Sequence, residues 1–207
     1  NNCYLLRLED DSREEWAGVT QRAMSCLMTG GGIGVDVSIC RPSGRQLRRT
    51  GGVASGPIPL LFTLNEVGRN VMQGGSRRSA LYGSLNWAHE DASNLLTAKN
   101  WHDMRLGKQQ EYSVSDMKKF NFNYPAPLDM MNVSLNYDDA WLKNGASEVF
   151  MQNCRQAMMT GEPGFSFNFG EKQNETLRNA CTEITSEDDS DVCNLGSVNL
   201  ANIESVE

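Results

Sequence analysis

Strand-like and helix-like segments alternate along the whole chain of 207 residues, and this order limits the possible folds more than any other feature. Residues 12–27 show the signals of a helix: Ser12 can cap its start, acidic residues follow in the first turn, and apolar residues recur at helical spacing. The glycine run 30–34 should end this helix, and the alternating run 35–39 is expected to be a strand. An α/β order of this kind favours parallel strands joined by helical crossovers.

The same alternation continues to the end of the chain. Further helices are expected over residues 57–72, 92–99, 115–120 and 138–160, the last with a break at Asn144-Gly145 and a cap at Gly161. Further strands are expected over residues 78–87, 131–135 and 165–169, and at the two ends over 1–8 and 197–203. Because both ends look like strands and the first residue is not Met, we expect residues 1–207 to be a segment of a longer protein.

Composition argues against several classes of function. The net charge of −7 disfavours a general nucleic-acid binder, which would carry a basic face. The acidic run 187–191 is most simply a solvated loop. No apolar run of about 18 residues is present, so no membrane span is expected, and no secretion leader is visible. These features favour a cytoplasmic protein.

The six cysteines do not form a zinc motif, because there is no CxxC pair and the chain has only two histidines. A secreted disulfide framework is not expected without a leader. Most of the cysteines should therefore be buried thiols of a cytosolic protein. They stand at positions 3, 26, 40, 154, 181 and 193.

Two segments nevertheless carry residues suited to chemistry. In residues 179–183 an amide, a thiol and a carboxylate occupy alternate positions, so an extended segment would point all three at one small substrate. The run 30–34 lies after a helix and before a strand, the reverse of a dinucleotide-binding fingerprint, and taken alone it is most simply a turn. Residues 73–80 combine glycines with two arginines, which favours a nucleotide-responsive loop.

Five strings in this order resemble the large (catalytic) subunit of ribonucleotide reductases. They are TGGGIGVDVSICRPSG at residues 29–44, TGGVASGPIP at 50–59, MQGGSRRSA at 72–80, Asn179-x-Cys181-x-Glu183, and VCNLGSVNL at 192–200. The resemblance implies an α/β fold, about the first half of the ten-stranded barrel of this family, with a finger loop through its centre. Residues 1–207 would then be a partial barrel domain, with N- and C-terminal parts missing.

The resemblance also implies roles for the residues of these motifs. Cys181 would hold the transient thiyl radical that abstracts the ribose 3′ hydrogen, and Glu183 would take the proton of the 3′ hydroxyl. Asn179 would orient the substrate hydroxyls. Cys3 and Cys193 would supply two electrons and become a disulfide, which requires Cα atoms about 4.4–6.8 Å apart. Cys26, Cys40 and Cys154 match no motif and are expected to be structural.

By the same resemblance, Asn2, Gly31 and Gly32 would contact the substrate, a ribonucleoside di- or triphosphate. An allosteric site for dNTP or ATP effectors would lie between the subunits of a homodimer. It would use Asp10 (or Asp11) and Arg41, with help from residues 43–52. Residues 74–80 would relay the effector's identity to the substrate, with Arg77 as the reading residue, although Arg78 and Ser79 stand where some relatives have glycines.

The short spacing of twelve residues from Cys181 to Cys193, and the strings RPSG, TGGVASGPIP and MQGGSRRSALYGSLNW, resemble the adenosylcobalamin-dependent class II. That class implies adenosylcobalamin as cofactor, no protein-bound metal ion, and a thioredoxin- or glutaredoxin-type reductant. The product would be deoxyribonucleotides for DNA synthesis. Three alternatives stay open: a class I large subunit with a separate radical-generating small subunit, a glycyl-radical relative, and a non-catalytic nucleotide-binding module.

Overall fold

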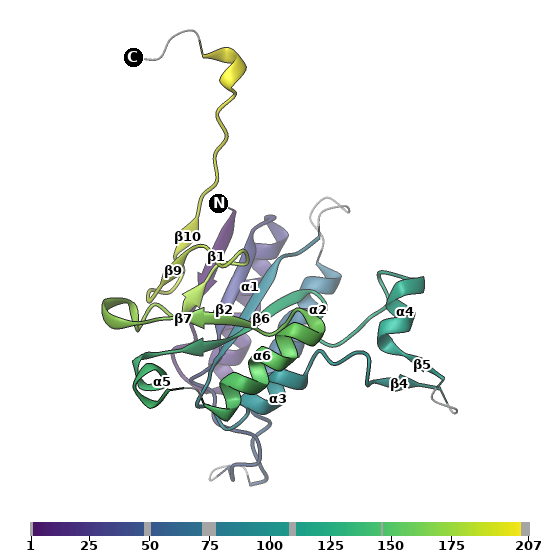
Figure 1. Ribbon diagram of the computed structural model, residues 1–207. Helices are drawn as coiled ribbons and strands as arrows, with labels where there is room; N and C mark the ends of the chain where they lie inside the picture. The colour runs from purple at the N-terminus through teal and green to yellow at the C-terminus, as the bar shows by residue number, and fades with distance from the viewer. Residues whose placement is uncertain (1, 48–50, 72–77, 108–110, 146, 204–207) are drawn as a thin grey trace.

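The computed structural model describes residues 2–47, 51–71, 78–107, 111–145 and 147–203 (Figure 1). Its centre is a six-stranded sheet in the order β10-β1-β2-β3-β6-β7. Five strands are parallel: β1 (Cys3–Leu6), β2 (Gly32–Asp36), β3 (Leu81–Asn86), β6 (Met131–Tyr137) and β7 (Gly164–Phe167). The sixth, β10 (Val192–Cys193), pairs antiparallel with β1. The predicted α/β class with parallel strands is confirmed.

Helices connect the parallel strands and begin and end where the sequence indicates. The Ser12 hydroxyl accepts a hydrogen bond from the backbone N–H of Glu15 at 3.0 Å and caps the first helix. Gly161 ends the last one in the left-handed region, at a φ of 84°. None of the helices in the described ranges is long and apolar enough to cross a membrane. The helices are α1 (Arg13–Met28), α2 (Ile58–Asn70), α3 (Ala92–Thr97), α4 (Val114–Phe120), α5 (Asp139–Asn144) and α6 (Glu148–Thr160).

The two faces of the sheet differ in character because strand side chains alternate. On one face, apolar side chains pack into the main core with the helices, among them Ile33, Leu85 and Leu135. Apart from Leu5, the opposite face carries mainly small or polar residues, among them Cys3, Gly32, Gly34, Asp36, Tyr82, Ser84, Ser134, Asn136 and Ser166. Because these side chains are small, residues 178–180 can lie close to the backbone of β2 on this face.

Short elements complete the described structure. The hairpin of β4 (Arg105–Leu106) and β5 (Tyr112–Ser113), together with α4, projects away from the sheet (Figure 1). A second hairpin joins β8 (Leu177–Arg178) to β9 (Thr185–Ser186). Two 3-10 turns are present, η1 (Gly170–Lys172) and η2 (Leu200–Asn202).

Two of the expected strands are wrong in position or type. The strand expected at 35–39 lies at Gly32–Asp36 instead, so most of the glycine run is strand rather than turn. Its glycines suit a strand because the chain passes directly over them. The strand expected at 197–203 is absent, and η2 lies there. Within the described residues that segment has no neighbouring strand to supply a ladder of hydrogen bonds.

Candidate active site

The segment with alternating amide, thiol and carboxylate is a tight turn between β8 and β9, so the extended conformation that would align all three side chains does not occur here. The backbone N–H of Thr182 donates to the carbonyl of Asn179 at 3.0 Å, and Thr182 has a φ of 71°. Cys181 is therefore presented inside a β-turn. β8 and β9 lie on the two sides of this turn and pair as antiparallel strands, so the hydrogen bonds between them hold the ends of the turn together.

The turn still brings the two polar side chains together. The Asn179 amide donates from Nδ2 to Glu183 Oε1 at 2.8 Å, and its Oδ1 accepts from the backbone N–H of Ile184 at 3.1 Å. Asn179 is fully buried, so these bonds fix its orientation. Asn179 thereby orients the Glu183 carboxylate, whose second oxygen can accept a further hydrogen bond.

Cys3 and Cys193 lie directly opposite each other on β1 and β10, although 190 positions separate them in the sequence. Opposed residues of an antiparallel pair have Cα atoms about 4.5–5.5 Å apart, which falls within the range that a disulfide requires. Both are free thiols and both are buried, with Ala180 as the third member of a small cluster. Register alone thus places the two thiols where they can form a reversible bond.

Glu183 lies between the amide and the cysteine pair. The Cys193 thiol points at Glu183 Oε1 from 3.8 Å. Burial, and then the Glu183 carboxylate, raise the pKa of Cys193. Burial of the thiol and then the Glu183 carboxylate also raise the pKa of Cys181, with smaller contributions from Cys3 and Cys193. The residue Cys181 as a whole is exposed. At neutral pH these sulfurs therefore keep their hydrogen, the form in which a thiol donates a hydrogen atom rather than acting as a thiolate nucleophile.

Cys181 and Cys3 open into a pocket of about 140 Å³, and the three predicted substrate contacts Asn2, Gly31 and Gly32 line it too. A Cβ added at Gly32 would lie 3.1 Å from the Cys3 sulfur, and one at Gly31 would lie 2.5 Å from the nearest atom of the Tyr4 ring. These glycines therefore keep the pocket open beside the thiols. The remaining lining residues are Leu27, Gly30, Arg78, Ser79, Ala80 and Leu195.

Sequence reasoning assigned no role to Arg78 in this pocket. Its guanidinium lies over the Phe122 ring, 4.5 Å from the ring centre, and donates to Asn123 Oδ1 at 2.9 Å. The sequence did offer one signal for this position, because Arg78 stands where some relatives have a glycine. Arg77, the predicted reader of effector identity, lies outside the described residues, as do residues 48–50 and 74–76 of the two predicted loops.

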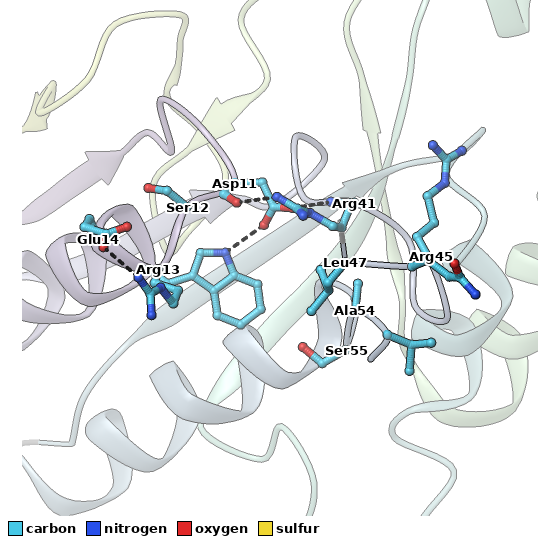
Figure 2. A pocket seen from close by; sticks show the side chains of 13 residues that line it. Asp11, Ser12, Arg13, Glu14, Arg41, Arg45, Leu47, Ala54 and Ser55 are labelled. Atoms are coloured by element: carbon cyan, nitrogen blue, oxygen red, sulfur yellow. Dashed lines mark hydrogen bonds and ion pairs between the residues drawn. The ribbon is translucent and has the colours of Figure 1, made fainter. Parts of the chain in front are cut away.

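A second, larger pocket of about 1420 Å³ is lined by Arg41 and Asp11, two of the residues considered for the effector site (Figure 2). Arg41 bonds to Asp11 through its Nε and backbone N–H, and its Nη2 donates to the Asp11 carbonyl at 2.8 Å. The Trp16 indole N–H also donates to the Asp11 carboxylate, at 3.1 Å. Asp10 does not line the pocket, because its carboxylate turns back to accept from the Ser12 N–H at 2.8 Å. Asp11 is thus the acidic partner of Arg41.

Among the described residues, no group of three or more His, Cys, Asp or Glu side chains is arranged to hold a metal ion. The site is instead built from three thiols, an amide and a carboxylate on a parallel α/β sheet. This combination defines the class: an α/β domain that carries a cluster of thiols beside an amide and a carboxylate. Comparison with known proteins makes the assignment specific. Residues 1–206 match the family described as "Ribonucleotide reductase, barrel domain", and the chain belongs to this family, which confirms the resemblance.

The relatives agree on the family, but only some of them are named as vitamin B12-dependent. A vitamin B12-dependent ribonucleoside-diphosphate reductase of Mycobacterium tuberculosis (strain CDC 1551 / Oshkosh) is 28% identical over 96% of this chain and 30% of its own length. The ribonucleoside-diphosphate reductase large subunit of Danio rerio is also 28% identical, over 97% of this chain and 30% of its own. The chain thus spans about 30% of the length of these relatives.

A solved structure supports the fold. The Actinobacillus ureae class Id ribonucleotide reductase alpha subunit aligns with a TM-score of 0.57 over 81% of this chain and 27% of its own, at 16% identity. At this identity the likeness concerns the fold alone. It agrees with an α/β sheet that forms part of a barrel.

Proposed function

We propose that the full-length protein containing this chain reduces ribonucleotides to 2′-deoxyribonucleotides by thiyl-radical chemistry. The observation that carries the proposal is the clustering of three thiols with an amide and a carboxylate. Cys3 and Cys181 line one pocket, and Cys193 lies opposite Cys3. Glu183 contacts both the Cys193 thiol and the Asn179 amide. A nucleotide-sensing module would need none of these thiols. Membership of the family is consistent with the same activity.

Each residue has a role that suits its surroundings. A radical on the Cys181 sulfur takes the hydrogen atom from C3′ of the ribose and later returns it, so Cys181 is unchanged overall. Glu183 accepts the proton of the 3′ hydroxyl, and Asn179 holds the carboxylate and the substrate hydroxyls in position. The 2′ hydroxyl leaves as water, and the Cys3 and Cys193 thiols supply the two electrons and two protons while they form one disulfide.

The disulfide must then be opened again for a second turnover. A dithiol such as thioredoxin, glutaredoxin or dithiothreitol does so by thiol–disulfide exchange and is itself oxidised. Arg41 and Asp11 are the proposed contacts of a dNTP or ATP effector, in the large pocket of Figure 2. Arg77 is the proposed reader of effector identity. We also propose a homodimer, a cytoplasmic location, and a ribonucleoside di- or triphosphate as substrate.

For the radical source we propose adenosylcobalamin, because the first relatives compared are named as vitamin B12-dependent. When bound, this cofactor would supply the oxidising equivalent that forms the Cys181 radical. Exposure of Cys181 leaves its sulfur accessible to such a cofactor. The pocket of about 140 Å³ beside it is far too small for a corrin, so the described residues do not hold the cofactor on their own. The Danio rerio relative, not named as B12-dependent, supports the alternative of a separate radical-generating subunit.

The test is formation of deoxynucleotide by the full-length protein with dithiothreitol, with and without adenosylcobalamin. We expect the wild type and Cys154→Ser to be active and Cys181→Ser to be inactive, because Cys154 lies on α6, outside the site. Activity only with the cofactor would support the cobalamin class, and activity only with an added small subunit would support the alternative. Full activity of Cys181→Ser would refute the mechanism.

A further inference from the structure

Arg178 lies at the end of β8, immediately before the turn that carries Cys181, and connects two distant parts of the sheet. Its backbone carbonyl lies against Gly34 of β2, where an added Cβ would be 2.8 Å from the carbonyl carbon. Its side chain reaches in the other direction, to β7 and the residues after it. Because β3 and β6 lie between β2 and β7, this one residue extends across the small, polar face of the sheet.

The guanidinium makes three bonds at the β7 side. Nε donates to the Ser166 hydroxyl at 2.6 Å, and Nη2 donates to the Phe167 carbonyl at 3.3 Å and to Asn168 Oδ1 at 3.2 Å. Ser166 and Asn168 are buried, with exposed fractions of 0% and 3%. Ser166 lies on β7 and Asn168 directly follows it, and buried acceptors have little freedom to move, so they hold the guanidinium in a defined place.

The remaining arm of the same guanidinium reaches the turn. Nη1 donates to the carbonyl of Thr182 at 3.1 Å. Thr182 adopts a φ of 71°, which is unfavourable for a β-branched residue and persists only where the surroundings hold it. The Arg178 side chain therefore bonds both to Thr182, which directly follows Cys181, and to β7 of the central sheet.

We propose that Arg178 is a positioning residue that sets the place of the Cys181 turn relative to Cys3 and Cys193. The inference rests on the proposed function, since its consequence is the rate of the radical reaction. Arg178 acts through the Thr182 carbonyl and does not touch the substrate. In the part of the chain that the structure describes, its side chain forms no ion pair, and its four acceptors are neutral oxygens.

The chemistry of the side chain explains why an arginine stands here. A planar guanidinium presents N–H donors in a rigid fork, so it can bond to acceptors on opposite sides at fixed angles. A lysine has a single ammonium on a flexible stem and cannot reproduce this fan of bonds. Charge alone is therefore not sufficient at this position, which makes Arg178→Lys the informative variant.

The experiment compares Arg178→Lys and Arg178→Ala with the wild type in the full-length enzyme. The matched control is Arg155→Lys, because Arg155 is exposed on α6 and has only a loose pair with Glu148 at 3.9 Å. We expect kcat to fall at least about tenfold in Arg178→Lys and roughly a hundredfold in Arg178→Ala, since a misplacement of about 1 Å can cost that much. KM should change little, and Arg155→Lys should match the wild type.

A second measurement separates positioning from simple loss of folding and does not depend on turnover. The rate of alkylation of Cys181 by iodoacetamide, followed by peptide mass spectrometry, should increase in both Arg178 variants, while that of Cys26 on α1 stays unchanged. A general loss of structure would increase both rates. The proposal is overturned if kcat per folded molecule and Cys181 alkylation are unchanged, or if Arg178→Lys restores both. If the wild type forms no deoxynucleotide, the proposed function fails, while the alkylation rates still test the positioning role.

Discussion

Gly34→Ala tests whether the close approach of the Cys181 segment to β2 matters for activity. A Cβ at this position would lie 2.8 Å from the carbonyl carbon of Arg178 and closer still to its oxygen. Ordinary carbon–carbon contacts are about 3.5–4.0 Å, so the two backbones must separate by roughly 1 Å or more. β2 is held by β1 and β3 on its two sides, and therefore we expect the Arg178 segment to yield.

The magnitude follows from this displacement. A shift of about 1 Å in catalytic geometry can lower the rate roughly a hundredfold, and overpacking costs about 1–3 kcal/mol of stability. The assay is deoxynucleotide formation by the full-length enzyme, with thermal unfolding measured in parallel. The control is Gly18→Ala within α1, where the nearest atom is 3.8 Å away and alanine should stabilise the helix by about 0.5–1 kcal/mol. A Gly34→Ala enzyme with wild-type kcat and stability would refute the reasoning.

Three further outcomes are expected. Asp129→Asn should destabilise the fold by about 3 kcal/mol in chemical denaturation, because its buried carboxylate bonds to two cations. Burial raises the pKa of Asp129, but the bonds to the two cations outweigh burial and lower it overall. The stabilisation by the carboxylate is therefore complete above about pH 4, the usual pKa of an unfolded Asp, and is lost as the pH falls through the lower pKa of the folded state. Asp129→Asn should not show this loss. Asp11→Asn should weaken effector binding in calorimetry more than Asp10→Asn does, and equal effects would contradict the placement of Asp11. Alkylation of Cys181 should be slower at pH 7 than that of a free cysteine. Glu183→Gln should accelerate it by removing a charge that raises the thiol pKa, and no acceleration would argue against this electrostatic effect.

Local signals in the sequence were sufficient for most elements. Ser12 caps α1 and Gly161 ends α6 as expected, because capping depends on a few neighbouring residues. The parallel arrangement also followed from the order of strands and helices. The glycine run was misplaced, since a local reading treats glycines as a turn. In the folded chain Gly32 and Gly34 lie in β2 to make room for another segment.

The sequence by itself determined the α/β class, the helices and, through its motifs, which thiols, amide and carboxylate to examine. Only the tertiary structure decided how they meet. Cys3 and Cys193 face each other through a strand register that connects positions 190 residues apart, and no local preference encodes such a pairing. The choice of Asp11 over Asp10 depends on Arg41, 30 residues away in sequence. The bond of Arg178 to Ser166 likewise joins residues 12 positions apart. The physical reason is that propensity and capping act within a few residues, whereas register, close packing and buried hydrogen bonds are set by the whole sheet.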